Sequence, residues 1–460
     1  MLREKPLDYA TAGAGDLARA LAARQVSAVE LFEAAVQAIE TKDGPINAIV
    51  VRDFDRAREQ AKAADAALAR GEARPLLGVP MTVKESHNVA GLPTTWGLEP
   101  FRGWTPDADS TGVARLKAAG AVILGKTNVP PSLGDWQADN PIYGRTNNPH
   151  DLTRSPGGSS GGGAAALAAG MVPLEFGSDI GGSIRVPAHF CGVFGHKPSY
   201  GLIPLTGHAP PGVPTTGEPV QFGVVGPLAR TAADLDLALG VLAGPEGDMA
   251  RGYRLDLKPP RAAALKDFRV LVIAEHPLAG VDAEVLGPIE ALAERLARLG
   301  AKVERQSPLV PDLVAAHETY MRLLGTTLSR GQRSDGGRPP IDAHAWMDGL
   351  DVIARHRRQW AALFETFDVV LAPPLGVAAF PHKDAPDWGS RTLTLNGEET
   401  PFGAQIAWPG LAGFPGLPAT CAPLGRTPGG LPTGVQILGP LFEDRTPIAF
   451  AGLVARELGD

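Results

Sequence analysis

The sequence predicts an α/β protein layered around a mixed, mostly parallel core sheet. Apolar, β-branched runs of strand length alternate with segments of helical periodicity, most clearly at 268–275 (FRVLVIAE), 283–299 and 367–374 (FDVVLAPP). Neither a repeat period nor a long low-complexity linker divides the 460 residues, so we expect one large domain.

The N-terminal elements follow from periodicity and capping signals. Residues 15–41 are predicted as helices, and Ser27 with Glu30 forms a capping box. The apolar ladder after this box has helical period and comprises Val29, Phe32, Val36 and Ile39. An alanine-rich stripe predicts a second helix over 54–70, which Gly71 ends.

The chain then alternates strands and helices. We expect strands at 47–51, 78–83 and 121–126, and helices at 111–120 and 162–171. Two weakly patterned stretches, 203–222 and 380–402, are predicted as long loops. Long loops in a compact domain are often functional.

Composition excludes several classes of protein. Hydrophobic residues make up 44% and charged residues 20%, which is ordinary for a globular chain with a sizeable core. The net charge is −7 and the pI about 5.9, so no basic face favours nucleic acid or anionic lipid. We expect no membrane span and no signal peptide. Cys191 and Cys421 lack framework spacing and are predicted as buried thiols, which fits the cytoplasm.

Two glycine-rich turns, each carrying a serine, are the most informative part of the chain. Ser159 lies in PGGSSGGG and Ser183 in SDIGGSIR. Glycine permits positive φ and close backbone approach, so successive N–H groups in such a turn can converge on one negative oxygen. Two glycines directly precede Ser183, so the amides of Ile180, Gly181, Gly182 and Ser183 can converge, as acyl transfer requires.

Lys84 follows an apolar run, LLGVPMTVK, at the expected end of a buried strand. Lysine is a base only when it is neutral, and burial lowers its pKa by disfavouring the charged form. Taken alone, this position is more typical of a strand-end lysine that extends to solvent. Together, Lys84, Ser159 and Ser183 supply a base, a bridge and a nucleophile, which indicates a serine hydrolase without a catalytic histidine.

These motifs resemble the amidase signature family. The pattern is GVPMTVK, then GGSSGG, then DIGGSIR followed by GHKP, and the similarity continues through GPLART (226–231) to LPTGVQILGP (431–440). The family includes fatty acid amide hydrolases, peptide amidases, aryl acylamidases and the glutaminase subunit of tRNA-dependent amidotransferases. The resemblance implies one amidase domain over 1–460, with helices on both faces of the sheet, a helical segment at 1–70 packed on the core, and a signature core at about 76–231.

The resemblance also implies catalytic roles. Ser183 is then the nucleophile, and the N–H groups of residues 180–183 form the oxyanion hole. Ser159 links Ser183 to Lys84, carries the proton to the lysine and hands it to the departing amine. In the family, the peptide bond at the position of Ser159 is cis.

Several neighbours have supporting roles by the same resemblance. Ser160 and Ser155 either support the proton relay or satisfy backbone groups. Asp179 and Arg185 are expected to pair and to hold the nucleophile turn. Many relatives carry aspartate after the lysine, where this chain has Glu85, for which we expect a shifted salt bridge.

Sequence motifs for other chemistries are incomplete or absent. GGSSG around Ser159, followed late in the chain by His382, matches the nucleophile elbow of an α/β-hydrolase esterase, but the segment before it is predicted as a loop, not a strand. HExxH and Cys-x-x-Cys are absent, and His189 and His196 lack metal-ligand spacing. We expect neither a metal nor a cofactor.

Substrate identity depends on residues outside the signature. By position in the family, Leu133, Gly134, Asp135 and Trp136 are expected near the acyl pocket. The 203–222 loop and the 320–360 region are expected to shape the leaving-group side. Further tryptophans in predicted walls or lids, although each alone is more typical of a core position, are Trp346, Trp360 and Trp388.

We expect a small, neutral, largely apolar substrate, with aryl amides, carbamates (urethanes) and esters as candidates. The main competitor within the family is the amidotransferase subunit, which accepts glutamine and has a partner that handles ATP and tRNA. The proline-rich segment 200–230 favours a free-standing hydrolase. The sequence does not indicate an oligomeric state.

Overall fold

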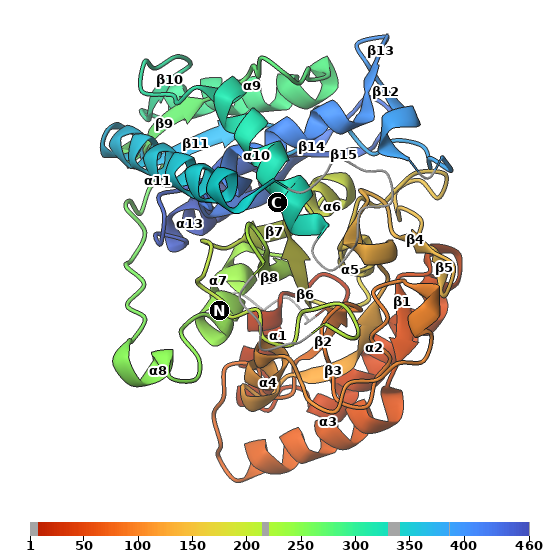
Figure 1. Cartoon of the computed structure of the whole chain (residues 1–460). Helices are drawn as coiled ribbons and strands as arrows, with labels where there is room; N and C mark the ends of the chain where they lie inside the picture. Colours follow the sequence, from red (N-terminus) through yellow and green to blue (C-terminus); the bar gives the residue numbers. More distant parts are fainter. Residues whose placement is uncertain (1–7, 214–219, 330–340, 386, 460) are drawn as a thin grey trace.

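A mixed β-sheet with strands from both halves of the chain crosses the molecule (Figure 1). The computed structural model describes residues 8–213, 220–329, 341–385 and 387–459. Within these ranges the strands of the sheet are, in spatial order, β1 (Ile49–Arg52), β3 (Val122–Thr127), β2 (Pro80–Lys84), β6 (Leu174–Asp179), β8 (Val224–Ala229), β7 (Phe194–Lys197), β14 (Ala419–Arg426), β15 (Pro432–Leu438), β11 (Val369–Ala372), β9 (Arg269–Val272) and β10 (Lys302–Glu304). Outside it, β4 (Asp139–Asn140) pairs with β5 (Gly144–Arg145), and β12 (Thr392–Leu395) with β13 (Glu398–Pro401).

The direction of strand pairing changes along the sheet. Near one end, β2 pairs in parallel with β3 and β6, and at the other, β9 pairs in parallel with β10 and β11. The pairs from β6 through β8, β7, β14 and β15 to β11 are antiparallel, as is β1 with β3. The α/β class and the mixed sheet are confirmed, but the predicted parallel majority is corrected for the centre of the sheet.

The connections between strands explain why the centre of the sheet is antiparallel. Parallel neighbours need a crossover, whereas antiparallel neighbours can be joined directly. The segments between β7 and β8 and between β14 and β15 contain no helix in their described parts, and they reverse the chain. Alternating helix and strand patterns in a sequence report the crossovers and miss such reversals.

Helices surround the sheet. In chain order, those of the described ranges are α1 (Ala14–Ala22), α2 (Ala28–Ile46), α3 (Phe54–Ala69), α4 (Thr111–Ala118), α5 (Gly161–Ala168), α6 (Arg185–Cys191), α7 (Ala232–Leu242), α8 (Met249–Gly252), α9 (Ala283–Arg298), α10 (Leu313–Leu328), α11 (Ala343–Thr366), α12 (Ala407–Gly413) and α13 (Arg445–Leu458). Short 3₁₀ helices are η1 (Glu99–Phe101), η2 (Pro131–Leu133), η3 (Leu265–Asp267), η4 (Trp388–Ser390) and η5 (Phe402–Ile406).

Neighbouring residues of β6 show that helices lie on both faces of the sheet. A Cβ added to Gly112 of α4 would lie 2.4 Å from Phe176, and one added to Gly163 of α5 would lie 2.4 Å from Glu175. Successive side chains of a strand point to opposite faces, so α4 and α5 cover opposite faces. Glycine lets both helices approach the sheet closely.

The predicted N-terminal elements are confirmed, with shifts of a few residues at their ends. α2 begins with the predicted capping box, in which Ser27 Oγ accepts from Glu30 N at 3.1 Å and the Glu30 carboxylate accepts from Ser27 N at 2.8 Å. α3 buries one stripe of its alanines and ends before Gly71, which has a φ of 81°.

The segment 380–402 is not the uninterrupted loop that the sequence predicts. β12 and β13 form a hairpin within it, and Asn396 and Gly397 at its turn have φ values of 51° and 88°. Asn-Gly is the preferred pair where both central residues of a turn need positive φ, so the sequence contained a signal for this hairpin. The other predicted loop has neither helix nor strand up to residue 213, and residues 214–219 lie outside the described ranges.

Cys191 and Cys421 are both buried and unpaired, as predicted. In the part of the chain that the structure describes, no helix combines the length and the apolar character needed to cross a membrane.

Candidate active site

Lys84, the last residue of β2, ends in a fully buried amine beside two serine hydroxyls. Its Nζ lies 2.6 Å from Ser159 Oγ and 2.9 Å from Ser178 Oγ. Burial lowers the pKa of Lys84 to about 7, against the opposing charges of Asp179 and Glu175. An amine with this pKa is partly neutral at neutral pH and can accept a proton.

Ser159 lies in a loop that packs closely against the chain after η2. The peptide bond between Gly158 and Ser159 is cis, as the resemblance implies. A Cβ on Gly158 would lie 2.4 Å from Asp135 O and 2.3 Å from Gln137 O, so only glycine fits there. This packing holds the buried Ser159 hydroxyl against Lys84.

Two further serines tie this loop to its surroundings. Ser160 N donates to Ser183 O at 3.1 Å, and Ser160 Oγ donates to Ser178 O at 3.2 Å. Ser155 Oγ donates to a backbone carbonyl at 2.9 Å. Both hydroxyls therefore bond to backbone groups, which is one of the two roles that the sequence leaves open.

Ser183 lies in the turn between β6 and α6 and is 6% exposed. We call residues 180–183 the Ser183 turn. Gly182 has a φ of 97° in this turn, a conformation that favours glycine. No hydrogen bond joins the side chains of Ser183 and Ser159, both of which the structure describes, and the backbone of Ser160 links the two residues. Hydrogen bonds of catalytic groups often form fully only in the substrate complex.

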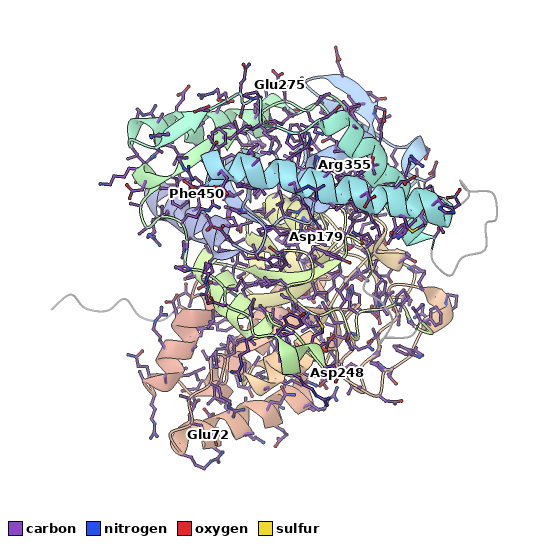
Figure 2. All side chains as sticks on the ribbon, turned by 60° about the vertical axis from the view of Figure 1, so that its left-hand side comes forward. Glu72, Asp179, Asp248, Glu275, Arg355 and Phe450 are labelled. Carbon is purple, nitrogen blue, oxygen red and sulfur yellow. The ribbon has the colours of Figure 1, made fainter. Side chains whose placement is uncertain are left out.

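Asp179 and Arg185 hold the Ser183 turn from the interior, where Figure 2 labels Asp179. The carboxylate accepts from Gly182 N at 2.9 Å and from Ile184 N at 3.0 Å, and it pairs with Arg185 at 2.9 Å. Burial alone would raise the pKa of Asp179, but the Arg185 guanidinium and these hydrogen bonds lower it to about 2. A buried ion pair therefore anchors the turn.

The four backbone amides of the Ser183 turn differ in their partners. Gly182 N–H donates to Asp179 Oδ1 at 2.9 Å. The N–H groups of Ile180, Gly181 and Ser183 have no acceptor among the residues that the structure describes. Convergent N–H groups without acceptors are what a developing oxyanion needs.

Three of the predicted pocket residues precede Trp136 in the chain. Leu133 is half-buried and Gly134 is exposed. Asp135 forms an ion pair with Arg391 at 2.7 Å, which fixes this segment to the region between η4 and β12.

The predicted tryptophans have different surroundings. Trp136 is 2% exposed, and its ring lies 4.6 Å from Trp388 and 5.2 Å from Phe402. Trp346 is half-buried beside the same apolar cluster. Trp360 is fully buried in another cluster and is a core residue, so its expected place in a pocket wall is wrong.

Glu85 does not form the expected salt bridge with any cation among the described residues. Its carboxylate accepts from Thr95 Oγ1 at 2.8 Å, from Trp96 N at 2.9 Å and from Tyr143 Oη at 3.2 Å. Backbone and hydroxyl donors of a nearby turn thus take the place of a cation.

The histidines do not support the alternative chemistries. His382 bonds to Asn147 Oδ1 at 3.1 Å and not to Ser159, so the nucleophile-elbow arrangement is absent from these described residues. His189 and His196 are buried and bonded within the core. Over the described ranges, no group of three or more His, Cys, Asp or Glu side chains is placed to hold a metal ion.

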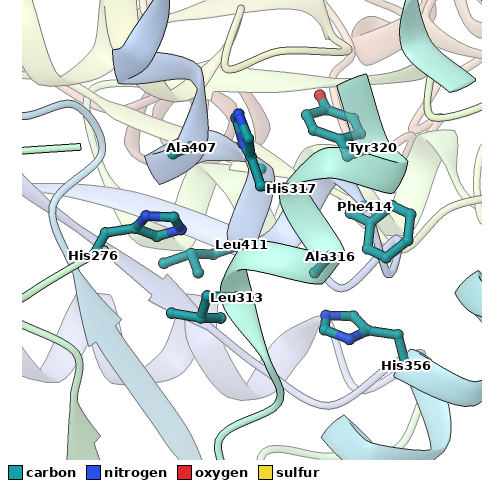
Figure 3. A pocket seen from close by; sticks show the side chains of 10 residues that line it. His276, Leu313, Ala316, His317, Tyr320, His356, Ala407, Leu411 and Phe414 are labelled. Atoms are coloured by element: carbon teal, nitrogen blue, oxygen red, sulfur yellow. The ribbon is translucent and has the colours of Figure 1, made fainter. Parts of the chain in front are cut away.

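A small pocket lies between α10, α11 and α12, and His276, His317 and His356 contribute to its lining (Figure 3). Tyr320 of α10 connects this pocket to the Ser183 turn, because its hydroxyl donates to Ile180 O at 2.7 Å. No sequence motif marks Tyr320, so it was not among the predicted site residues.

Ser178 and Glu175, which face Lys84, were also missed. Both lie on β6, directly before the Ser183 turn, and this position was the available signal.

Known proteins resemble this chain over nearly its whole length. The family model described as Amidase matches residues 30–337 and 341–447. A glutamyl-tRNA(Gln) amidotransferase subunit of Anaeromyxobacter dehalogenans is 34% identical over 97% of this chain and 95% of that protein. Fatty-acid amide hydrolase 2-A of Danio rerio is 32% identical over 96% of this chain and 88% of that protein. The crystal structure of a bacterial aryl acylamidase of the amidase signature family superposes with a TM-score of 0.79 and 27% sequence identity. The match covers 97% of this chain and 96% of that chain.

Proposed function

Because the chain belongs to the amidase family, whose members hydrolyse amides, we propose that it forms an acyl-enzyme on Ser183, with Ser159 and Lys84 as the proton relay. The observation that carries this proposal is the 2.6 Å contact between the buried Lys84 Nζ and Ser159 Oγ. A serine hydroxyl is a weak nucleophile and needs an adjacent base. The neutral amine of Lys84 is that base.

The reaction begins when Ser183 Oγ attacks the amide carbonyl carbon. The Ser183 proton passes to Ser159, and the Ser159 proton passes to Lys84 Nζ. The C–N bond then breaks, and the Lys84 ammonium returns its proton through Ser159 to the leaving amine. Water attacks the acyl ester along the same relay, which releases the acid and restores Ser183.

The oxyanion hole in this mechanism comprises the N–H groups of Ile180, Gly181, Gly182 and Ser183. The lack of described acceptors for three of these groups supports this assignment. Gly182 already donates to Asp179, so we expect it to contribute least.

We propose a neutral, largely apolar substrate, with aryl amides and aryl carbamates as the preferred class. Ile180 and Trp388 are partly exposed members of an apolar cluster that also contains Trp136 and Phe402. Aromatic walls with few polar groups suit an apolar ligand. A carbamate presents the same carbonyl and an amine leaving group, so the relay needs no further residue to cleave it.

Arg391, which lies beside this cluster, is engaged in an ion pair, and Arg355 is exposed on the surface. Arg391 donates to both oxygens of Asp135, at 2.8 and 2.7 Å. Arg355 lies on the outer helix α11 (Figure 2). The Arg391 guanidinium is therefore not free to receive a substrate carboxylate, which supports the preference for neutral substrates.

A fluorophosphonate probe tests the nucleophile. We expect it to label Ser183, and we expect Ser183→Ala to abolish both labelling and amide hydrolysis. Labelling at Ser159, or persistent labelling of the alanine variant, would refute the assignment.

A second candidate is the glutaminase-type subunit of a tRNA-dependent amidotransferase, because the glutamyl-tRNA(Gln) amidotransferase subunit of Anaeromyxobacter dehalogenans is 34% identical to this chain. The purified chain, without ATP, tRNA or a second protein, separates the two functions. Faster hydrolysis of an anilide or aryl carbamate than of glutamine supports the free-standing hydrolase, and the reverse preference supports the amidotransferase role.

A further inference from the structure

Two side chains from distant parts of the chain hold two of the carbonyl groups of the Ser183 turn. Tyr320 Oη, on α10, donates to Ile180 O at 2.7 Å. Trp136 Nε1, in the loop after η2, donates to Gly181 O at 3.0 Å. Neither side chain is assigned a role in the proposed proton relay.

A bond to a carbonyl also sets the direction of an N–H group. A peptide unit is planar and trans, so fixing the carbonyl of Ile180 fixes the N–H of Gly181 on the opposite side. Glycine imposes little preference of its own on the adjacent dihedral angles, so this orientation has to come from outside the turn.

The first two of the three peptide units in this turn are held unequally. The unit between Gly181 and Gly182 is bonded at both ends, by Trp136 at its oxygen and by Asp179 at its N–H. The unit between Ile180 and Gly181 is bonded at its oxygen by Tyr320, and its N–H has no acceptor among the described residues.

We propose that Tyr320 is a positioning residue for amide hydrolysis: its hydroxyl aims the N–H of Gly181 at the oxyanion of the tetrahedral intermediate. This inference rests on the proposed acyl-enzyme mechanism at Ser183. Tyr320 does not touch the substrate in this arrangement and acts through the backbone.

The surroundings of Tyr320 suit this role. The side chain is fully buried, and its ring lies 5.1 Å from that of Phe222 in an edge-on contact. A Cβ on Gly410 or on Gly413 of α12 would lie 3.3 Å from Tyr320, so small residues let the ring lie close to α12. In Figure 3 the hydroxyl points away from His356. Burial raises the pKa of Tyr320, so the hydroxyl remains a hydrogen-bond donor.

Tyr320→Phe tests the proposal, because it removes the hydroxyl and keeps the packed ring. Loss of a direct oxyanion donor typically lowers kcat by about 10²–10³-fold, and we expect a loss of about 10-fold when a donor is only misdirected. KM should be unchanged. Inhibition by an aryl trifluoromethyl ketone, which forms a tetrahedral adduct with serine, should weaken by the same factor as kcat.

Tyr9→Phe is the matched control. Tyr9 Oη also donates to a backbone carbonyl, that of Met171, at 2.9 Å. Met171 lies before β6, and the Ser183 turn lies after it, so the same change is made at the opposite end of one strand. We expect Tyr9→Phe to have wild-type kcat and inhibitor affinity.

Trp136→Phe provides a second comparison. In this variant the peptide unit between Gly181 and Gly182 keeps its bond to Asp179, so kcat should fall less than in Tyr320→Phe. Wild-type kcat and inhibitor affinity in Tyr320→Phe would overturn the inference, as would a rise in KM alone. If Ser183→Ala is inactive in that case, the acyl-enzyme mechanism still stands; if Ser183→Ala is active, the mechanism itself fails.

Discussion

Two strands of the central sheet end in a buried lysine, and the two lysines have different partners. Lys84 ends β2 and Lys197 ends β7, with exposed fractions of 0% and 1%. Burial lowers the pKa of each to about 7. By burial and pKa alone, the two are equal candidates for a general base.

Their hydrogen bonds separate them. Lys84 Nζ contacts the hydroxyls of Ser159 and Ser178, and a hydroxyl can both give and take a proton. Lys197 Nζ donates to Pro198 O at 2.8 Å, and a backbone carbonyl has no proton to exchange. Burial thus sets the protonation state of a lysine, and its hydrogen-bond partners determine whether that proton can be used.

Replacing each lysine by methionine gives the largest expected difference. Lys84→Met should fold and should lower kcat at least about 10³-fold, because the serines lose their base. Lys197→Met should keep the wild-type kcat per folded molecule. Steady-state kinetics on a chromogenic anilide, with folding checked by circular dichroism, measure both; equal losses of kcat would break the comparison.

Lys197→Met also tests how the buried lysine affects stability. The folded-state pKa of Lys197, about 7, lies below its ordinary value of 10.5, so the unfolded chain binds more protons between these pH values. Stability therefore rises with pH across this window, and the cost of burying the lysine is fully present below pH 7. In Lys197→Met this contribution is removed, so thermal melts from pH 7 to 10 should show a flatter rise in Tm.

Asp179→Asn is expected to lower the free energy of unfolding. Removing one partner of a buried ion pair costs about 3–5 kcal/mol, because Arg185 is left uncompensated. The lowered pKa of Asp179 means that its stabilising effect is present above pH 3.8 and is lost as the pH falls through about 2. Urea unfolding at neutral pH measures the loss, and a change within 0.5 kcal/mol, typical of surface substitutions, would contradict it.

The sequence predicted the helices and most strands near the two ends of the sheet better than the strands at the centre of the sheet. Helices such as α2 and α3 carry caps and an apolar stripe, which are local signals. β8 and β15 lie in quoted motifs and β6 lies directly before one, but none of the three was recognised as a strand, because each contains glycine or proline where strand propensity expects branched residues. Their strand conformation comes from burial between neighbours, which is a tertiary effect.

The candidate site shows the same limit. Lys84 was predicted from an apolar run and a motif, and the structure places it against Ser159. Tyr320 has no such marker, because its role depends on which turn packs beside its helix. Glu85 was expected to form an ion pair, but local backbone donors satisfy it, and a sequence does not show how a turn directs its N–H groups.

The pH profile sharpens the comparison of the two lysines. Since Lys84 must be neutral in the free enzyme, kcat/KM should rise about tenfold per pH unit below pH 7 and level off above it. Lys197→Met should keep this profile. A rate that is flat through neutrality, with chemistry limiting, would exclude Lys84 as the base.

The smallest expected effect comes from Glu175, which lies on the same face of the sheet as Lys84. Thr82 and Lys84 are alternate residues of β2 and share that face, and Glu175 bonds to Thr82 and, at 2.6 Å, to Thr127. Burial raises the pKa of Glu175 to about 7, although both threonines and Lys84 lower it.

An ionised Glu175 stabilises the Lys84 ammonium, so Glu175→Gln should lower the pKa of Lys84 further. The acid limb of kcat/KM should then move to lower pH, while the plateau rate stays the same. The shift should be small, because Glu175 is itself partly protonated where Lys84 titrates. The control is Glu72→Gln on the surface, which should leave the limb in place. A limb that moves to higher pH in Glu175→Gln would mean that this carboxylate does not support the charged form of the base.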